Sequence, residues 1–241
     1  MPRQHPTFVR PTDQHAELFT QHRPAMLQVL YKNNQLIACN KPPGIAVQPD
    51  KTGDPDFLSQ VEAYCKHPLH IIHRLDRPVS GLILFAKSKS AMTAMTEQFR
   101  QRSVRKEYLA VVQQAPPAPE GTLVHFLRKN EAKNLAKAFD TEQPGTERSE
   151  LRYRILGSSE RYHLLHIEMI TGRHHQIRAQ LAAIGCPIKG DVKYGFRRSN
   201  ADRSIHLHAW RMAFDHPVSG ERVELEASVP DEVVWQAFGV I

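Results

Sequence analysis

Short apolar runs, and runs in which apolar and polar residues alternate, recur along the chain between turns of polar residues. The clearest alternation is YHLLHIEM at 162–169, where successive side chains must point to opposite faces of a sheet. The apolar run LILFA from Leu82 is typical of a strand that is buried on both faces. We predict strands at 27–31, 36–40, 82–87, 107–112, 151–156, 162–169 and 222–227.

Apolar residues with helical spacing occur between several of these strands. Met92, Met95 and Phe99 share one face of a helix predicted at 89–102. The helices are scattered among the strands and do not repeat as βαβ units, so the pattern indicates an α+β fold. Further helices are predicted at 57–66, at 174–184 with Gly185 as the end signal, and from Pro230 onward.

A charged segment at 128–150 follows a proline-rich loop at 115–120. Lys129, Lys133 and Lys137 are four residues apart, which would place them on one face of a helix. A solvated surface is the favoured interpretation of such a charge run. Contact with phosphate groups is the alternative.

The chain has 241 residues, of which 41% are hydrophobic, and this is enough for one substantial core. We predict an N-terminal extension at 1–25 and one domain at 26–241. The extension is rich in Pro, Gln and His and lacks the apolar stretch of a signal peptide or membrane anchor. Cys39, Cys65 and Cys186 form no CxxC pair, so we expect buried thiols in a cytoplasmic protein. Nothing in the sequence indicates an obligate oligomer, and we expect a monomer.

The balance of charge is basic, with 32 Lys and Arg against 25 Asp and Glu. A basic surface attracts polyanions such as nucleic acids and steers their association. Many basic proteins never bind RNA, so the charge by itself identifies no partner.

Residues 72–87, IHRLDRPVSGLILFAK, place Asp76 between Arg74 and Arg77, close to His73. Neighbouring positive charge favours the ionised form of a carboxylate. The apolar run that follows would hold Asp76 in a loop against a rigid sheet, a common position for catalytic groups. An ionised Asp at such a position suits a nucleophile or an electrostatic stabiliser. A surface turn with structural ion pairs fits the same residues equally well.

Five blocks in a fixed order resemble the RluA-like branch of the pseudouridine synthases, which modify uridines in ribosomal and transfer RNA. HRLDRPVSGLIL resembles the family signature HRLDxxTSGLLL, with Val79 in place of Thr. The other blocks are LIACNKPPGIAVQPD from Leu36, RKEYLAVV from Arg105, TGRHHQIRAQLAAIGCPIKGDVKYG from Thr171 and LHAWRMAFDHPVSGE from Leu207. Gln48 and Gln180 stand where the family often has His. The resemblance covers the chain from about Met26 to its end.

The resemblance implies a large, mostly antiparallel central sheet with flanking helices and a central active-site cleft. It also implies an isomerisation in which atoms are conserved and no redox step occurs, so no cofactor and no metal is expected. Asp76 would act at the ribose, either as a nucleophile or as a base. Tyr108 would pack against the target base and remove the proton at C5. Arg178 would pair with the catalytic carboxylate, because its planar guanidinium can fix both orientation and charge.

The resemblance also implies a set of residues that bind the RNA or the target base. Arg74 matches an arginine that fills the stack after the uridine leaves it, although an ion pair with Asp76 is the alternative. Ile177, beside Gln176, matches a position that shapes the uracil pocket. The remaining candidates for RNA contact are His73, Arg77 and Arg173.

Two further interpretations compete with this assignment. An RNA-binding or chaperone-like protein could keep the fold without turnover, although such a protein has no need of Asp76, Tyr108 and Arg178 together. His206 and His208 would lie on one side of a strand and could share a zinc ion, but no HExxH or similar spacing supports a metal enzyme. The sequence leaves open which RNA is modified.

Overall fold

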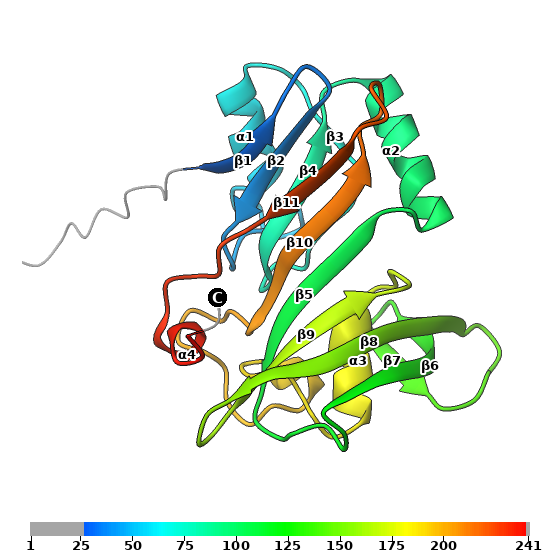
Figure 1. The fold of residues 1–241 in the computed structure, drawn as a ribbon, viewed down its shortest axis with the longest axis vertical. Helices are drawn as coiled ribbons and strands as arrows, with labels where there is room; N and C mark the ends of the chain where they lie inside the picture. The colour runs from blue at the N-terminus through cyan, green and yellow to red at the C-terminus, as the bar shows by residue number, and fades with distance from the viewer. Residues whose placement is uncertain (1–26, 240–241) are drawn as a thin grey trace, which may run out of the picture.

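The computed structural model describes residues 27–239. The predicted extension at 1–25 lies outside this range, as do the first residue and the last two residues of the predicted domain. The described residues form an 11-stranded sheet (Figure 1). Its main path runs through β1 (Gln28–Lys32), β2 (Leu36–Lys41), β4 (Ser80–Ala86), β10 (Leu207–Asp215), β5 (Arg105–Val112), β9 (His163–Met169), β8 (Glu147–Ser158), β6 (Glu120–Asn130) and β7 (Leu135–Phe139), in that order.

Two short strands join the sheet outside this path. β3 (His70–Ile71) pairs with β4, and β11 (Arg222–Glu226) pairs with β10. Only the pairing of β10 with β4 is parallel among the strand pairs of the described chain. The mostly antiparallel sheet is therefore confirmed.

Helices flank the sheet and confirm the α+β prediction. The helices are α1 (Phe57–Cys65), α2 (Lys89–Gln101), α3 (Gln176–Ala183) and the short α4 (Val233–Gln236), and a 3-10 turn, η1, spans Val192–Tyr194. Asp56 caps α1 and Ser88 caps α2, each accepting a hydrogen bond from a backbone N–H of the first turn. No helix among residues 27–239 is long and apolar enough to cross a membrane.

β4 owes its unbroken apolar sequence to cover on both of its faces. Ile83 and Phe85 pack into the core beneath α1, whereas Leu82 and Leu84 pack into the core beneath α2. All four side chains are at most 1% exposed. A strand covered on both sides has no polar face to show, which is why this segment lacks alternation.

The charged segment at 128–150 is not helical, so that prediction is wrong. Lys129 lies in β6 and Lys137 in β7, which form a hairpin, and Lys133 lies in the turn between them. The Asn130 side chain accepts a hydrogen bond from the Lys133 backbone at 3.0 Å, which stabilises that turn. β3, β6, β7 and β10 were not among the predicted strands.

The close approach of β4 to β10 depends on Gly81. A Cβ atom at this position would lie 2.3 Å from the carbonyl oxygen of Ala209, and the backbone has φ +113°. No other residue type fits that conformation without strain. The loop at 72–79, which carries Asp76, enters the sheet immediately before this contact.

Candidate active site

Asp76 lies in the loop between β3 and β4, at the base of a cleft. Leu75 and Val79 on either side of it are buried, at 7% and 3% exposure, and anchor the loop to the core. The backbone N–H of Val79 donates to the carbonyl of Asp76 at 3.0 Å and closes a tight turn. The carboxylate is held between buried neighbours and stays partly exposed, at 27%.

Arg178 on α3 contacts this carboxylate from the other side of the cleft. Its Nη1 donates to Oδ2 of Asp76 at 2.8 Å. Its Nε and Nη2 donate to the two carboxylate oxygens of Asp191, at 2.7 and 2.9 Å. Burial opposes the charge of Arg178, but the hydrogen bonds and charges of Asp191 and Asp76 outweigh it and raise the pKa above its usual value. The guanidinium is therefore a fixed, permanently charged link between the two carboxylates.

His175 is the second group that approaches Oδ2 of Asp76, with its Nε2 at 3.3 Å. The backbone N–H of Ala136 donates to the Tyr194 hydroxyl at 2.8 Å, and this hydroxyl lies 2.9 Å from Nδ1 of His175. Burial lowers the pKa of His175 to about 3, so the ring is neutral. The nearby carboxylate of Asp76 favours the tautomer with its single ring proton on Nε2, in which the Tyr194 hydroxyl donates to Nδ1.

Tyr108 on β5 and Ile177 on α3 line the small pocket beside Asp76. Burial, followed by the charge of Asp76, raises the pKa of Tyr108, so the side chain is a neutral phenol at neutral pH. Ile177 is 4% exposed and gives the pocket an apolar wall. The pocket opens into a larger cleft of about 850 Å³ that Asp76 and Tyr108 also line.

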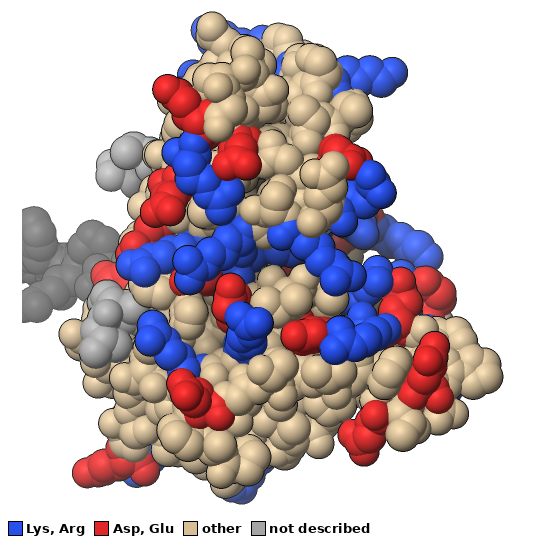
Figure 2. Space-filling view, turned by 45° about the vertical axis from the view of Figure 1, so that its right-hand side comes forward, with Lys and Arg blue, Asp and Glu red and all other residues tan. Residues whose placement is uncertain are grey.

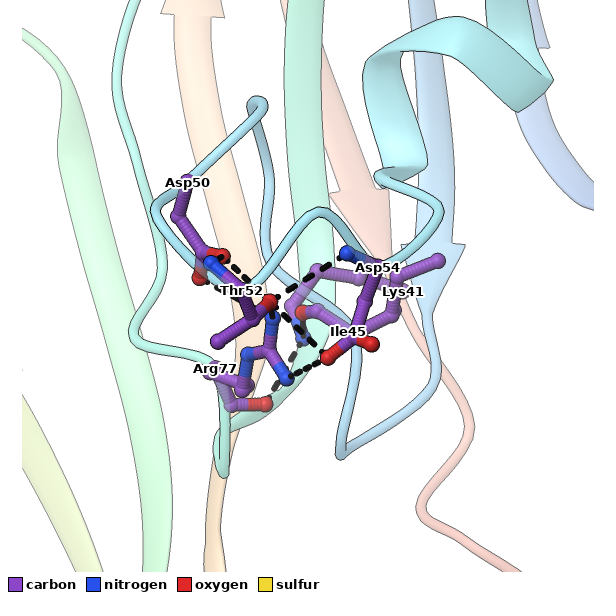
Figure 3. Close-up of polar contacts among 6 residues, drawn as sticks. All are labelled: Lys41, Ile45, Asp50, Thr52, Asp54 and Arg77. Atoms are coloured by element: carbon purple, nitrogen blue, oxygen red, sulfur yellow. Dashed lines mark hydrogen bonds and ion pairs between the residues drawn. The ribbon is translucent and has the colours of Figure 1, made fainter.

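Arg77 turns away from Asp76, which corrects the charge environment expected from the sequence. Its guanidinium pairs with Asp50 at 2.9 Å and with Asp54 at 2.7 Å (Figure 3). Asp76 instead receives its contacting cation from Arg178, 102 residues along the chain. Neighbouring residues of a tight loop point in different directions, so adjacency in sequence did not give contact here.

Lys41, which the sequence reasoning missed, holds the Asp76 loop from behind. It is fully buried, and its ammonium donates to the carbonyl of Pro42 at 2.8 Å. It also donates to the carbonyls of Ile45 at 3.0 Å and Arg77 at 3.4 Å (Figure 3). Burial lowers the pKa of Lys41 to about 7, although the charge of Asp76 opposes that shift. The side chain ties the loop after β2 to the loop that carries Asp76.

Two of the expected RNA-binding residues have their polar atoms engaged by the protein. His73 accepts a hydrogen bond from the backbone of Leu84 at 3.0 Å and stacks on Phe99, and burial lowers its pKa to about 3. Gln176 is 2% exposed, and its amide donates to the carbonyl of Glu150 at 3.0 Å and accepts from the backbone of Arg173 at 2.9 Å. Both side chains shape the walls of the site.

Cationic side chains gather along the cleft. Figure 2 shows Lys and Arg in a band across the middle of the molecule. Arg74 is exposed and lines both the small pocket and the cleft. Arg173 also lines both and pairs with Glu147 at 2.8 Å. The other cleft cations are Arg77, Lys106, Lys129, Arg178 and Lys193.

Gln180, which stands where the family often has His, makes specific hydrogen bonds in the structure. This side chain is fully buried on α3 and donates to the carbonyl of Leu123 at 3.1 Å, with Nδ1 of His125 also 3.1 Å away. It therefore ties α3 to β6.

Asp76, His174 and His175 form the one group within residues 27–239 whose ligand atoms are close enough to hold a metal ion, within 4.8 Å of one another. Arg178 contacts the same carboxylate, and its positive charge opposes a bound cation. His206 pairs with Glu232 at 2.8 Å and His208 contacts Ser80 at 2.9 Å, so neither histidine points to a shared ion.

Asp191 and Tyr194 were also missed, although both lie in the sequence block GDVKYG. The block marks them, but nothing in its spacing shows that Asp191 completes the hydrogen bonds of Arg178 or that Tyr194 reaches His175. The fold determines both contacts, because η1 lies against α3.

Residues 35–183 match the RNA pseudouridylate synthase family. The chain is 33% identical over 215 residues to ribosomal large subunit pseudouridine synthase C of Vibrio parahaemolyticus, covering 85% of this chain and 66% of that protein. It is 32% identical over 234 residues to tRNA pseudouridine synthase C of Salmonella typhimurium, covering 88% of this chain and 89% of that protein.

The fold is similar to that of two solved human structures. Human RNA Pseudouridylate Synthase Domain Containing 4 superposes with a TM-score of 0.68 and 23% identity, over 85% of this chain and 89% of that chain. Human RNA Pseudouridylate Synthase Domain Containing 1 superposes with a TM-score of 0.69 and 21% identity, over 88% of this chain and 92% of that chain. Both support the fold that the sequence blocks implied.

Proposed function

The chain belongs to the RNA pseudouridylate synthase family and is an RNA-modifying isomerase, and from this premise we propose that it converts a uridine of ribosomal or transfer RNA to pseudouridine with Asp76 as the reacting group. The names of the relatives support both kinds of RNA, since one is a ribosomal and another a transfer RNA enzyme. We further propose that the domain at 26–241 acts as a monomer, and that it acts in the cytoplasm, where both RNAs are found.

The observation that carries the assignment of Asp76 is the asymmetry of its two carboxylate oxygens. Arg178 and His175 both approach Oδ2, at 2.8 and 3.3 Å. Oδ1 has no hydrogen-bond partner among the residues that the structure describes, and the carboxylate lines the cleft. We therefore propose that Oδ1 is the reacting atom and that the contacts at Oδ2 fix the orientation of the carboxylate. A group held in one orientation reacts with less loss of entropy.

The reaction breaks the bond between N1 of uracil and C1′ of the ribose and joins C5 to C1′. C5 then loses its proton and N1 gains one, so the product is an isomer of the substrate. Oδ1 acts at the ribose, either by adding to C1′ or by removing the 2′ proton. Both routes require an ionised carboxylate and neither draws on a cofactor, so we propose that none takes part.

We propose that Tyr108 packs against the uracil ring, with Ile177 on another side of the pocket. The raised pKa of Tyr108 means that it enters the reaction as a neutral phenol. If it takes the proton from C5, it must release its own proton in the same step.

The target uridine must leave its helix to reach a carboxylate at the base of a cleft. We propose that Arg74 fills the vacated position, because it is exposed at the mouth of the pocket and pairs with no carboxylate of the described chain. Arg173 lies on the same rim, and we propose that the nitrogens it does not use for Glu147 contact the RNA backbone. Arg77 contributes long-range charge, since its guanidinium is already paired.

The experiment that tests the proposal maps pseudouridine in total RNA from cells with and without the gene, and then treats the unmodified RNA with purified protein. We expect one or more sites to be missing without the gene and to be restored by wild-type protein, but not by Asp76→Asn, which keeps the size of the side chain. Retained RNA affinity in this variant identifies the loss as chemical. Wild-type protein that binds RNA but restores no site would favour the alternative of a binding protein without turnover.

A further inference from the structure

Lys106 lies in the cleft but takes no part in the proposed reaction. It precedes Tyr108 by two residues on β5, so the two side chains lie on the same face of the sheet, about 7 Å apart along the strand. Glu107 lies on the opposite face, where it pairs with Arg105 at 2.7 Å and with His166 at 2.7 Å. The carboxylate of Glu107, although next in sequence, therefore does not pair with the Lys106 ammonium.

The surroundings of the Lys106 ammonium are apolar or neutral. It lies 5.5 Å from the centre of the Phe99 ring, on which the neutral ring of His73 stacks. Gly172 borders it so closely that a Cβ atom there would lie 3.0 Å from Nζ. Burial lowers the pKa of Lys106. Phe99 gives this cation a cation–π contact but no negative charge. A cation taken partly out of water with no anion beside it costs free energy, and an anion that enters the site recovers it.

Most other cations of the cleft are already paired within the protein. Lys129 contacts Glu131 at 2.8 Å, and Arg173 contacts Glu147 at 2.8 Å. Arg77 and Arg178 have their own carboxylates. The Lys106 ammonium makes no hydrogen bond or ion pair with any residue of the described range, and it is the one partly buried cation in the cleft of which this is true.

We propose that Lys106 binds a phosphate group of the RNA backbone next to the target uridine. The proposal rests on the proposed function, because it takes the uracil to lie against Tyr108. From there, one nucleotide of extended strand reaches the ammonium. The site fixes the position of the backbone and reads no base, as phosphate contacts generally do. The missing side chain at Gly172 leaves room for the phosphate oxygens to approach.

The test measures equilibrium binding of a synthetic RNA stem–loop with uridines in the loop, across a series of salt concentrations. Lys106→Met keeps the length and packing of the side chain and removes its charge. We expect affinity to fall roughly tenfold and the slope of log affinity against log salt to become shallower by about 0.7 to 0.9, the loss of one phosphate contact. Lys106→Arg keeps both near their wild-type values. Lys89→Met removes an exposed lysine outside the cleft and serves as the matched control.

Stability separates binding from a structural role. Because the ammonium has no ion pair or hydrogen bond to lose and Met can still pack against Phe99, Lys106→Met is expected to melt at the wild-type temperature or above it. Unchanged affinity and an unchanged salt slope in a folded Lys106→Met protein would overturn the proposal. Equal losses of affinity and of salt slope in Lys89→Met would also overturn it.

The binding assay needs no turnover, so it separates the two proposals. If Asp76→Asn retains full activity while Lys106→Met binds RNA more weakly and with a shallower salt dependence, the assignment of Asp76 fails and the phosphate site stands. If Lys106→Met binds as wild type while Asp76→Asn is inactive, the phosphate site fails and the proposed function stands.

Discussion

Replacing Arg178 with lysine tests the link between Asp76 and the rest of the site. Lysine keeps the charge but offers one ammonium in place of the fork that reaches Asp191 through two nitrogens and Asp76 through a third. Asp191 is 1% exposed and would be left as a poorly paired buried carboxylate. Breaking a buried ion pair from one side costs about 3 to 5 kcal/mol, which corresponds to a fall in melting temperature of roughly 6 to 20 °C at this size.

The same change releases Oδ2 of Asp76, since the Nη1 contact at 2.8 Å is lost. A displacement of the reacting group by about 1 Å costs on the order of 100-fold in rate. We therefore expect kcat of Arg178→Lys to fall about 100-fold with little change in KM. Thermal melting and single-turnover kinetics on the mapped RNA site measure the two effects separately.

The double variant Arg178→Lys with Asp191→Asn distinguishes stability from chemistry. Removing the buried negative charge recovers part of the lost stability, because the unpaired carboxylate is the main cost. It does not recover kcat, because Asp76 still lacks its guanidinium. Arg211→Lys breaks an exposed pair with Glu226 at 2.7 Å and is expected to cost at most about 1 kcal/mol. A kcat of Arg178→Lys within a few-fold of wild type would refute the reasoning.

Three further results are expected. Tyr194→Phe removes the hydroxyl between Ala136 and His175, so melting should show a loss of about 1 to 3 kcal/mol, and kcat should fall with KM unchanged. Burial lowers the pKa of His73 and His175 to about 3 and of His208 to about 4, so the unfolded chain binds more protons than the folded chain between these values and pH 6.5. The free energy of unfolding should therefore decrease as the pH falls through that range, by roughly 1.4 kcal/mol per pH unit for each histidine. Urea titrations at several pH values measure this decrease, and a free energy that does not change with pH would contradict it. Excess EDTA should leave turnover of a simple stem–loop unchanged, and a loss that zinc or magnesium restores would count against a cofactor-free reaction.

Elements with a strong local signal could be predicted from the sequence. β4 reads as a buried strand because both of its faces are covered, and α2 begins at the Ser88 cap and carries Met95 on its buried face. The hairpin of β6 and β7 had no such signal. Lysines four residues apart fit a helix and a hairpin equally well, and pairing of β6 with β8 decided between them.

The sequence by itself determined the family, through blocks whose order and residue types admit few other interpretations, and it singled out Asp76 and Arg178. Only the tertiary structure decided which cation contacts Asp76, because Arg77 is adjacent in the chain but paired with Asp50 and Asp54, while Arg178 reaches the carboxylate through space. It also places His175 between the Tyr194 hydroxyl and Oδ2 of Asp76, the two contacts on which the tautomer of the ring depends. The physical reason is range: apolar periodicity and caps act within one element, whereas ion pairs and tautomers depend on neighbours that only the folded chain brings together.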